Sequence, residues 1–380
     1  MTLIEEHQTM IVGVITAFFV SLLLTGIIIP KILLIAYRKN LFDEPDERKI
    51  HKGAIPRLGG IAFVPALIFS TSMIVGIFNL PYFDAITLDL DSESVRAICF
   101  GLCGLLLLFI VGIADDLVGV LYRAKFVIQL IAGFMLVCGG IWIDNLHGFC
   151  GIYAWPPACG CALTILVAIF FVNAINLIDG IDGLASGLSA IALAFYGVMF
   201  AFVGDIFNAL IAFATLGTLV QFFYYNVFGS QTQRKKIFMG DTGALCIGFI
   251  LTYLSVSIGR MDYFINSPLN PIVVAFAPIL VPCFDVLRVF FGRIRAGKSP
   301  FLPDKTHIHH KLLRLGMSKP SAMVLILCIS AAFSIVNVIF SPYVNPALLM
   351  TVDLIIWIAF NMWLSDCIKK RAPLVESKES

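Results

Sequence analysis

The chain has 380 residues, of which 59% are hydrophobic and only 13% are charged, and its formal net charge is +2. A composition this apolar excludes an ordinary soluble domain. The sequence therefore predicts a membrane protein that crosses the bilayer many times.

Eleven apolar runs are long enough to cross roughly 30 Å of hydrocarbon. The boundary between the sixth and seventh runs is the least distinct, because only Val203–Ile206 separates them. We therefore expect an all-α, polytopic bundle of about eleven transmembrane helices. The runs lie at 11–36, 57–78, 96–113, 125–143, 161–178, 186–203, 206–224, 242–259, 271–292, 321–340 and 345–367.

Basic residues gather in alternate loops, and their distribution predicts the orientation of the chain. Five segments hold 22 of the 26 lysines and arginines, namely 37–57, 114–125, 225–241, 293–320 and 368–380. Cytoplasmic loops carry such an excess, so the N-terminus is expected outside and the C-terminus in the cytoplasm. Residues 1–10 hold no basic residue, unlike a cleaved signal peptide, so we expect the first span to be retained.

The ten cysteines lie mainly in apolar runs, where cysteine is usually a small buried hydrophobe. Cys150, Cys159 and Cys161 fall in or beside an outer loop, so one disulfide among them stays open.

The first inner loop reads LFDEPDERKIHKGAIPRLGG, and it includes Lys49 and Arg57. A solvated basic anchor is one interpretation. Pro45, Pro56 and the Gly59–Gly60 pair favour a loop of defined shape instead.

The next block, GIADDLVGVLYRAK, places Asp115 and Asp116 at the end of one span and Lys125 at the start of the next. Neighbours on a helix point about 100° apart, so the two acids are expected to have separate duties. One faces a cation, and the other orients a lysine or the backbone. A helix end capped by acids is the alternative, but it opposes the helix dipole.

The central stretch 172–184 reads VNAINLIDGIDGL, and its polar residues recur every three positions. On a helix this spacing places them on one face. Acids inside a bilayer are costly, so we expect a helix end that faces a site open to water, with Gly180 and Gly183 letting the backbone turn. The four polar residues are Asn173, Asn176, Asp179 and Asp182.

Two further polar residues follow at the inner ends of later spans. Asn226 adjoins the aromatic pair Tyr224 and Tyr225, which suits a membrane-interface belt, so its own assignment stays open. Asp241 lies in RKKIFMGDTG between two glycines, where a carboxylate suits Mg²⁺ shared with substrate phosphates. An acid that caps the following helix is the alternative.

The longest inner loop, 293–320, is rich in basic residues and histidines, among them Arg293, Lys298, His307, His309 and His310. Histidines at i, i+2 and i+3 do not share a helix face and no cysteine accompanies them, which argues against a zinc site. A basic loop with histidine donors suits a phosphate-bearing ligand. Asp285, in the preceding span, is a further site candidate because it is an acid within the membrane.

All these blocks fall on the side that the basic residues mark as cytoplasmic. A transporter is expected to place polar groups near mid-membrane instead. Acids for Mg²⁺, basic groups for phosphate and an apolar body favour an enzyme that joins a soluble nucleotide to a lipid. Phosphoryl transfer needs mainly positioning and charge neutralisation, which these residues offer.

Taken together, DEPDERKIH with PRLGG, GIADDLVGV, NAINLIDGIDGL, FMGDTG and DKTHIHHKLL closely resemble the polyprenyl-phosphate N-acetylhexosamine-1-phosphate transferases, of the glycosyltransferase family 4 type. The resemblance implies transfer of a sugar 1-phosphate, with GlcNAc preferred, from a UDP-N-acetylhexosamine to undecaprenyl phosphate. UMP is released, and Mg²⁺ or Mn²⁺ is required. It implies a bacterial cytoplasmic membrane enzyme at the first membrane step of a cell-surface polysaccharide pathway such as O-antigen synthesis.

The alternatives are a muramoyl-pentapeptide-phosphate transferase, or a transporter of nucleotide-sugar or lipid. The block HIHH departs from the HHH-then-acid form of the muramoyl branch, which argues against that substrate. Relatives usually follow the GD-x-G turn with Ser, whereas this chain has Ala244, so a hydroxyl is absent there. No nucleic-acid partner is expected, and a homodimer stays open.

The resemblance also implies site residues. Catalytic positions are Asp115, Asp116, Asp241, His307, His309 and His310; substrate-binding positions are Lys49, Arg57, Lys125, Asn173, Asn176, Asp179, Asp182, Asn226, Arg293 and Lys298; metal ligands are Asp116, Asp182 and Asp241. We expect a single transferase domain over 1–367, with active-site loops at 37–57, 114–125, 179–185, 225–241 and 293–320, and a cytoplasmic tail at 368–380.

Overall fold

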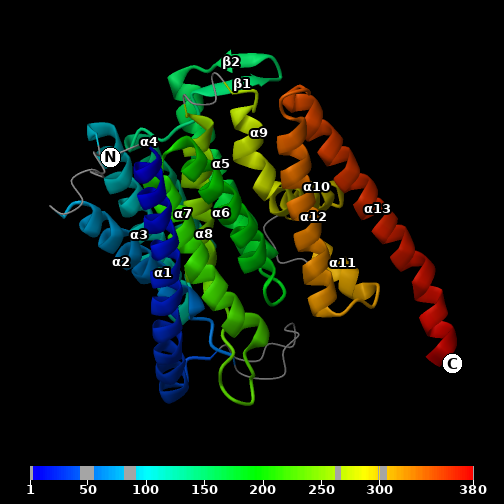
Figure 1. Ribbon diagram of the computed structural model, residues 1–380. Coiled ribbons are helices and arrows are strands. Elements are labelled where there is room, and N and C mark those ends of the chain that lie inside the picture. Colours follow the sequence, from blue (N-terminus) through cyan, green and yellow to red (C-terminus); the bar gives the residue numbers. More distant parts are fainter. Residues whose placement is uncertain are drawn as a thin grey trace.

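The computed structural model describes residues 3–42, 55–80, 91–261, 267–297, 299 and 306–379, and Figure 1 shows their arrangement. The chain is a helical membrane bundle with one small hairpin. Its elements are α1 (Leu3–Lys39), η1 (Gly59–Ala62), α2 (Phe63–Phe78), α3 (Ser92–Val118), α4 (Tyr122–Cys138), β1 (Asn145–Phe149), β2 (Ile152–Ala154), α5 (Pro157–Ile178), α6 (Leu184–Val203), α7 (Ile206–Phe223), η3 (Tyr224–Phe228), α8 (Gly240–Gly259), α9 (Pro271–Phe276), η5 (Ala277–Ile279), α10 (Leu280–Arg295), α11 (Ile308–Arg314), α12 (Lys319–Phe340) and α13 (Pro346–Glu379).

Within the described residues, ten helical segments are long and apolar enough to cross a membrane. The fourth predicted span, 125–143, is present as a further helix just below this length, and only its end is corrected. It corresponds to α4, which ends at Cys138 and has only 17 residues. The reason is the Gly139–Gly140 pair, since Gly140 adopts a φ of 83° and stops the helix before the apolar run ends. The doubtful boundary between α6 and α7 is confirmed as a break at Gly204–Asp205.

Although short, α4 runs the length of α3. A Cβ on Gly139 would lie 3.3 Å from the Cα of Ala97 near the start of α3. At the other end of α4, Lys125 bonds to Asp115 near the end of α3. The helix therefore passes from one end of the bundle to the other.

Helix α8 lies at the centre of the bundle. Its apolar window is 100% buried, against 28% for α1 and 22% for α13 at the periphery. Its sequence, GDTGALCIGFILTYLSVSIG, is apolar around most of its circumference, which is typical of a helix surrounded by others. Close packing on α5 depends on Gly248, where a Cβ would lie 2.5 Å from the Cα of Val172. Asp241, in the first turn of this central helix, is thus held at a fixed position at one end of the bundle.

The two ends of the bundle differ. At one end β1 and β2 pair antiparallel, with Asn145 opposite Ala154, and His147 Nε2 bonds to the carbonyl of Gly259 at the end of α8. The opposite end gathers the last residues of α3 and α5 and the first residues of α8. The two chain termini lie toward opposite ends, as an odd number of passes requires (Figure 1).

The central stretch does not form one continuous helical stripe as predicted. Helix α5 ends at Ile178, so Asn173 and Asn176 are helical, whereas Asp179 and Asp182 lie in a turn. The chain leaves the helix at Asp179, and Gly183, with a left-handed φ of 79°, leads it into α6. The ten cysteines, including Cys150, Cys159 and Cys161, are free thiols.

Candidate active site

A lysine between two carboxylates forms the core of the site. Lys125 Nζ lies 2.9 Å from Asp115 Oδ2 and 2.8 Å from Asp241 Oδ2, and so joins the ends of α3, α4 and α8. Asn176 Nδ2, from α5, donates to Asp241 Oδ1 over 3.3 Å. The other oxygen of Asp115 accepts the Val120 amide at 2.6 Å. Four elements thus converge on one charged cluster, although these residues span more than a hundred positions in the chain.

Asp116 has a separate duty, as the sequence predicted for this pair. Its Oδ1 accepts the backbone amide of Asp241 at 2.8 Å. Its Oδ2 accepts both the amide of Thr242 at 3.0 Å and the hydroxyl of Thr242 at 2.5 Å. Asp116 therefore caps the first turn of α8 from a neighbouring helix, where an anion also suits the helix dipole. It orients the backbone that carries Asp241.

Glycines allow the turns of this region to approach each other closely. A Cβ on Gly60 would lie 2.0 Å from the amide nitrogen of Gly243, and one on Gly112 would lie 2.4 Å from the Cα of Thr242. The Gly59 and Gly60 amides donate to the Phe238 and Met239 carbonyls at 2.9 and 2.8 Å. The blocks PRLGG and FMGDTG are therefore packed backbone to backbone, which explains their small residues.

The turn at 179–183 connects this cluster to the 236–237 segment. Asp182 Oδ2 accepts from Lys236 Nζ at 2.7 Å. Both polar atoms of the Asn226 side chain bond to the backbone. Its Oδ1 accepts the Gly183 amide at 2.6 Å, and its Nδ2 donates to the Ile237 carbonyl at 2.9 Å. Asn226 is 5% exposed. It holds the turn in place, a use that its position near an aromatic belt did not indicate.

Asp179 lies in this turn, close to several other carboxylates. Although its side chain reaches solvent, the protein around it removes much of its water, and this desolvation raises the pKa of Asp179 to about 7. Arg57 opposes the change, whereas the carboxylates of Asp182, Asp241 and Asp116 add to it. Four carboxylates thus lie close enough to act on one another in this region, which suits a cation at this place.

The histidines line the other side of the turn. His309 is 1% exposed, and neither of its ring nitrogens has a hydrogen-bond partner. A Cβ on Gly180 would lie 2.1 Å from His309 Nε2. The His307 and His309 rings are parallel, with centroids 5.9 Å apart, and the His309 and His310 centroids lie 4.2 Å apart. The structure thus brings all three histidines together with the turn.

His309 is neutral rather than cationic. Burial lowers the pKa of His309 to about 3, and repulsion from His310 and His307 contributes further. A neutral imidazole offers one donor and one acceptor. Its two unpartnered nitrogens are therefore suited to hydrogen bonding with a polar ligand.

The remaining predicted residues lie at varying distances from this cluster. Asn173 donates to Gln129 Oε1 at 2.7 Å, between α5 and α4. Arg293 is in the last turn of α10. Lys49 and Lys298 lie outside the described residues. Sequence reasoning missed Thr242 and Lys236; the basic run RKKIF beside FMGDTG was the available signal for Lys236.

The described residues hold no preformed cage of protein ligands for a metal ion. None of their His, Cys, Asp and Glu side chains form a group of three or more placed to hold an ion. Mg²⁺ usually keeps several waters and binds through one or two carboxylates plus substrate phosphates. The exposed part of Asp241, 26% of its side chain, and the carboxylate excess around Asp179 fit such a site.

The sequence is similar to that of known transferases. Residues 98–259 match glycosyl transferase family 4. Over 331 residues the chain is 32% identical to the probable undecaprenyl-phosphate N-acetylglucosaminyl 1-phosphate transferase of Bacillus subtilis (strain 168), covering 85% of this chain and 84% of the relative. It is 30% identical over 307 residues to the undecaprenyl-phosphate alpha-N-acetylglucosaminyl 1-phosphate transferase of Yersinia pestis, covering 80% and 78%. The protein of the same name from Escherichia coli (strain K12) is 29% identical over 342 residues, covering 88% and 86%.

Proposed function

Since this chain belongs to glycosyl transferase family 4, together with the undecaprenyl-phosphate N-acetylglucosaminyl 1-phosphate transferases, we propose that it transfers N-acetylhexosamine 1-phosphate to undecaprenyl phosphate. The donor is a UDP-N-acetylhexosamine, with UDP-GlcNAc as the first choice, and the second product is UMP. Neither a muramoyl-pentapeptide substrate nor a transport function is favoured by the relatives.

One observation carries the proposal. Lys125 joins Asp115 to Asp241 at one end of the bundle, and the turn at 179–183 lies between this cluster and the buried His309. The cluster supplies charge for a phosphate and a cation, and the histidine supplies neutral hydrogen bonding. A diphosphate that carries a sugar needs both kinds of contact.

In the reaction, a phosphate oxygen of the lipid attacks the phosphorus that bears the sugar. A new P–O bond forms, and the P–O bond to UMP breaks. Near pH 7 the lipid phosphate is already largely ionised, because the second pKa of a phosphate monoester is about 6. A general base therefore adds little, and both oxygens of Asp115 are already engaged with Lys125 and the Val120 amide. Asp115 holds Lys125 toward the phosphate.

We propose that Mg²⁺ or Mn²⁺ binds at Asp241. When bound, the ion neutralises the charge of the diphosphate. Each predicted ligand must exchange a bond to take the ion: Asp241 gives up Lys125 or Asn176, Asp182 gives up Lys236, and Asp116 gives up the first turn of α8. Asp179 is the preferred second carboxylate, because it is exposed and feels the carboxylates of Asp182 and Asp241.

The location is proposed on the distribution of charge. Lysines and arginines gather at the ends of the helices that carry the site, which supports a bacterial cytoplasmic membrane protein with its site facing the cytoplasm. The single transferase domain over 1–367 and the 368–380 tail belong to the same proposal. A cysteine placed at Ser230 in a cysteine-free variant should react with a membrane-impermeant maleimide only after cells are opened.

Release of UMP tests the function. Purified protein in detergent is incubated with UDP-GlcNAc, Mg²⁺ and a polyprenyl phosphate, and a panel of UDP-sugars then identifies the donor. We expect UMP only when the lipid acceptor is present, and none from the Lys125→Met variant, which leaves the two carboxylates facing each other. Wild-type protein that binds UDP-GlcNAc yet releases no UMP would overturn the proposal and favour transport.

A further inference from the structure

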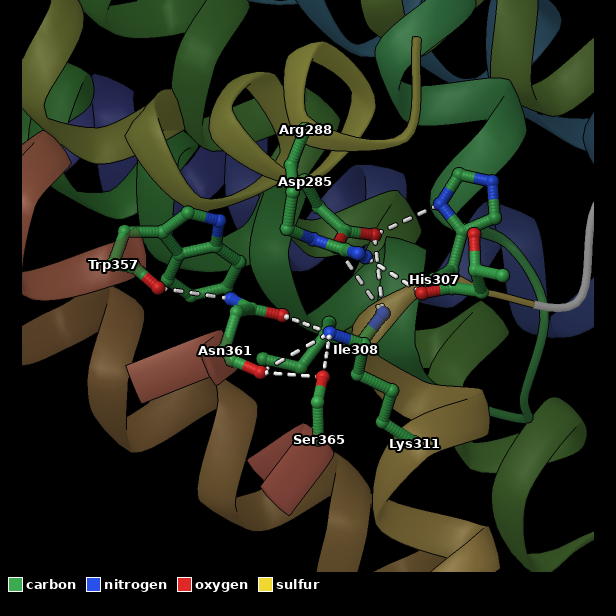
Figure 2. Close-up of polar contacts among 9 residues, drawn as sticks. Asp285, Arg288, His307, Ile308, Lys311, Trp357, Asn361 and Ser365 are labelled. Atoms are coloured by element: carbon green, nitrogen blue, oxygen red, sulfur yellow. Dashed lines mark hydrogen bonds and ion pairs between the residues drawn. The ribbon is translucent and has the colours of Figure 1, made fainter. Parts of the chain in front are cut away.

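The short helix α11, which carries His309 and His310, is held on two sides by polar contacts. On one side is α10, with Asp285 and Arg288, and on the other is α13, with Asn361 and Ser365. Figure 2 shows both sets of bonds. Both sets hold α11, and of the bonds drawn only the α10 set reaches a histidine ring, that of His307.

Asp285 makes the α10 contacts and is completely buried. Its Oδ2 lies 2.8 Å from His307 Nδ1, and its Oδ1 accepts the Ile308 amide at 3.1 Å. Arg288 balances the charge, since its Nη2 lies 2.7 Å from Asp285 Oδ1 and also donates to the Thr306 carbonyl at 2.7 Å. Each oxygen of this acid is directed at the start of α11.

The bond to His307 decides how that ring can act. A carboxylate only accepts hydrogen bonds, so Nδ1 must carry the proton. In the neutral ring Nε2 is then the acceptor, and the ring stays parallel to that of His309. Without the carboxylate, the ring is free to take the other tautomer or to turn.

We propose that Asp285 is a positioning residue for the transfer reaction, which acts through His307 and presents Nε2 of that ring to the UDP-sugar. The proposal rests on the function given above. Asp285 does not itself touch the substrate. A carboxylate that orients a histidine in this way is worth about 10–100-fold in activity where such pairs have been measured at metal sites.

The Asp285→Asn variant distinguishes a role in orienting the His307 ring from a role limited to accepting the Ile308 amide. Asparagine accepts an amide bond as well as aspartate does, so a role confined to capping Ile308 predicts nearly wild-type activity. A role through His307 predicts a fall of about 10–100-fold in kcat/KM for UDP-GlcNAc, with KM for the polyprenyl phosphate within about 2-fold of wild type. Asp285→Glu, which keeps the charge, should retain more activity than Asp285→Asn.

A double-mutant cycle identifies the partner. In a His307→Ala background, Asp285→Asn should change kcat/KM by less than about 2-fold, because the group it acts through is gone. Equal losses in both backgrounds would overturn the proposal, as would wild-type activity in the Asn variant. If the Asn variant does not fold, judged by its thermal unfolding in detergent, the Glu variant replaces it in the cycle.

Lys311 provides the matched control, because it secures the other side of α11. Its Nζ lies 3.0 Å from Ser365 Oγ and 3.2 Å from the Asn361 carbonyl. Lys311→Met should lower the melting temperature while leaving KM for UDP-GlcNAc within about 2-fold of wild type. If it reproduces the kinetic loss of Asp285→Asn, docking of α11 alone explains the effect and the proposal fails. A wild-type protein that releases no UMP would instead refute the proposed function.

Discussion

Replacing Gly180 with alanine should disable the site by displacing one ring. The new Cβ would lie 2.1 Å from His309 Nε2 and 2.4 Å from its Cε1, whereas ordinary contact begins at 3.4 Å. His309 must therefore retreat by about 1.3 Å, although it is 1% exposed and packed between His307 and His310. Gly180 has no positive φ, so the alanine backbone itself is unstrained.

A displacement of about 1 Å in a positioning group costs on the order of 100-fold in rate, or about 2.7 kcal/mol of barrier. We expect kcat/KM for UDP-GlcNAc to fall by about that factor in the UMP-release assay. The Gly292→Ala variant is the control, since a Cβ there meets no atom within 4 Å. In a His309→Ala background, the Gly180→Ala change should not lower kcat/KM any further. Equal losses with and without His309 would refute the reasoning.

Four further outcomes follow from the same contacts. Asn226→Ala leaves the Gly183 amide and the Ile237 carbonyl without partners, so the unfolding free energy should fall by about 1–3 kcal/mol; an unchanged melting temperature would contradict this. Asp115→Asn should retain measurable activity, and complete loss at every pH with intact binding of UDP-sugar and metal would restore a general base. Because the pKa of His309 falls from 6.5 to about 3 on folding, the unfolded chain alone binds a proton there between these values, so stability should drop below pH 6.5 by up to about 1.4 kcal/mol per unit. The His309→Gln variant should lack this loss of stability below pH 6.5. If the melting temperatures of wild type and variant change identically from pH 7.5 to 5, the prediction is wrong. Chelation of divalent metal should stop UMP release and added Mg²⁺ should restore it, but not in Asp241→Asn; activity that survives chelation would exclude the metal.

Much of the site was accessible from the sequence because its chemistry is local. Asp115, Lys125 and Asp241 each stand at the end of an apolar run, where a charge has a cost and so indicates a site. The three histidines were identified differently, as donors in a basic loop that suits a phosphate-bearing ligand. Neither pattern separated residues that would touch a ligand from those that hold the backbone, and Asp116 and Asn226 prove to bond to amides and carbonyls.

The helix boundaries were the weaker part of the prediction. Hydropathy continued past Gly139 and Gly140, so the fourth run was drawn too long, while α4 stops at Cys138. The three-residue spacing from Asn173 to Asp182 suggested one helix face, but α5 ends at Ile178. At Gly140 a left-handed φ overrides the hydropathy pattern, and at 179–183 a turn interrupts the three-residue spacing.

The sequence by itself determined that the chain is a membrane bundle, which of its ends carries charge and which residue types gather there, because bilayer insertion depends on composition along the chain. Only the tertiary structure decided the pairings: Lys125 with two acids, Asp116 with the start of α8, Asp285 with His307, and Gly180 with His309. These contacts join residues on different helices, and their geometry is set by how closely the glycine-bearing backbones pack, which no local pattern encodes.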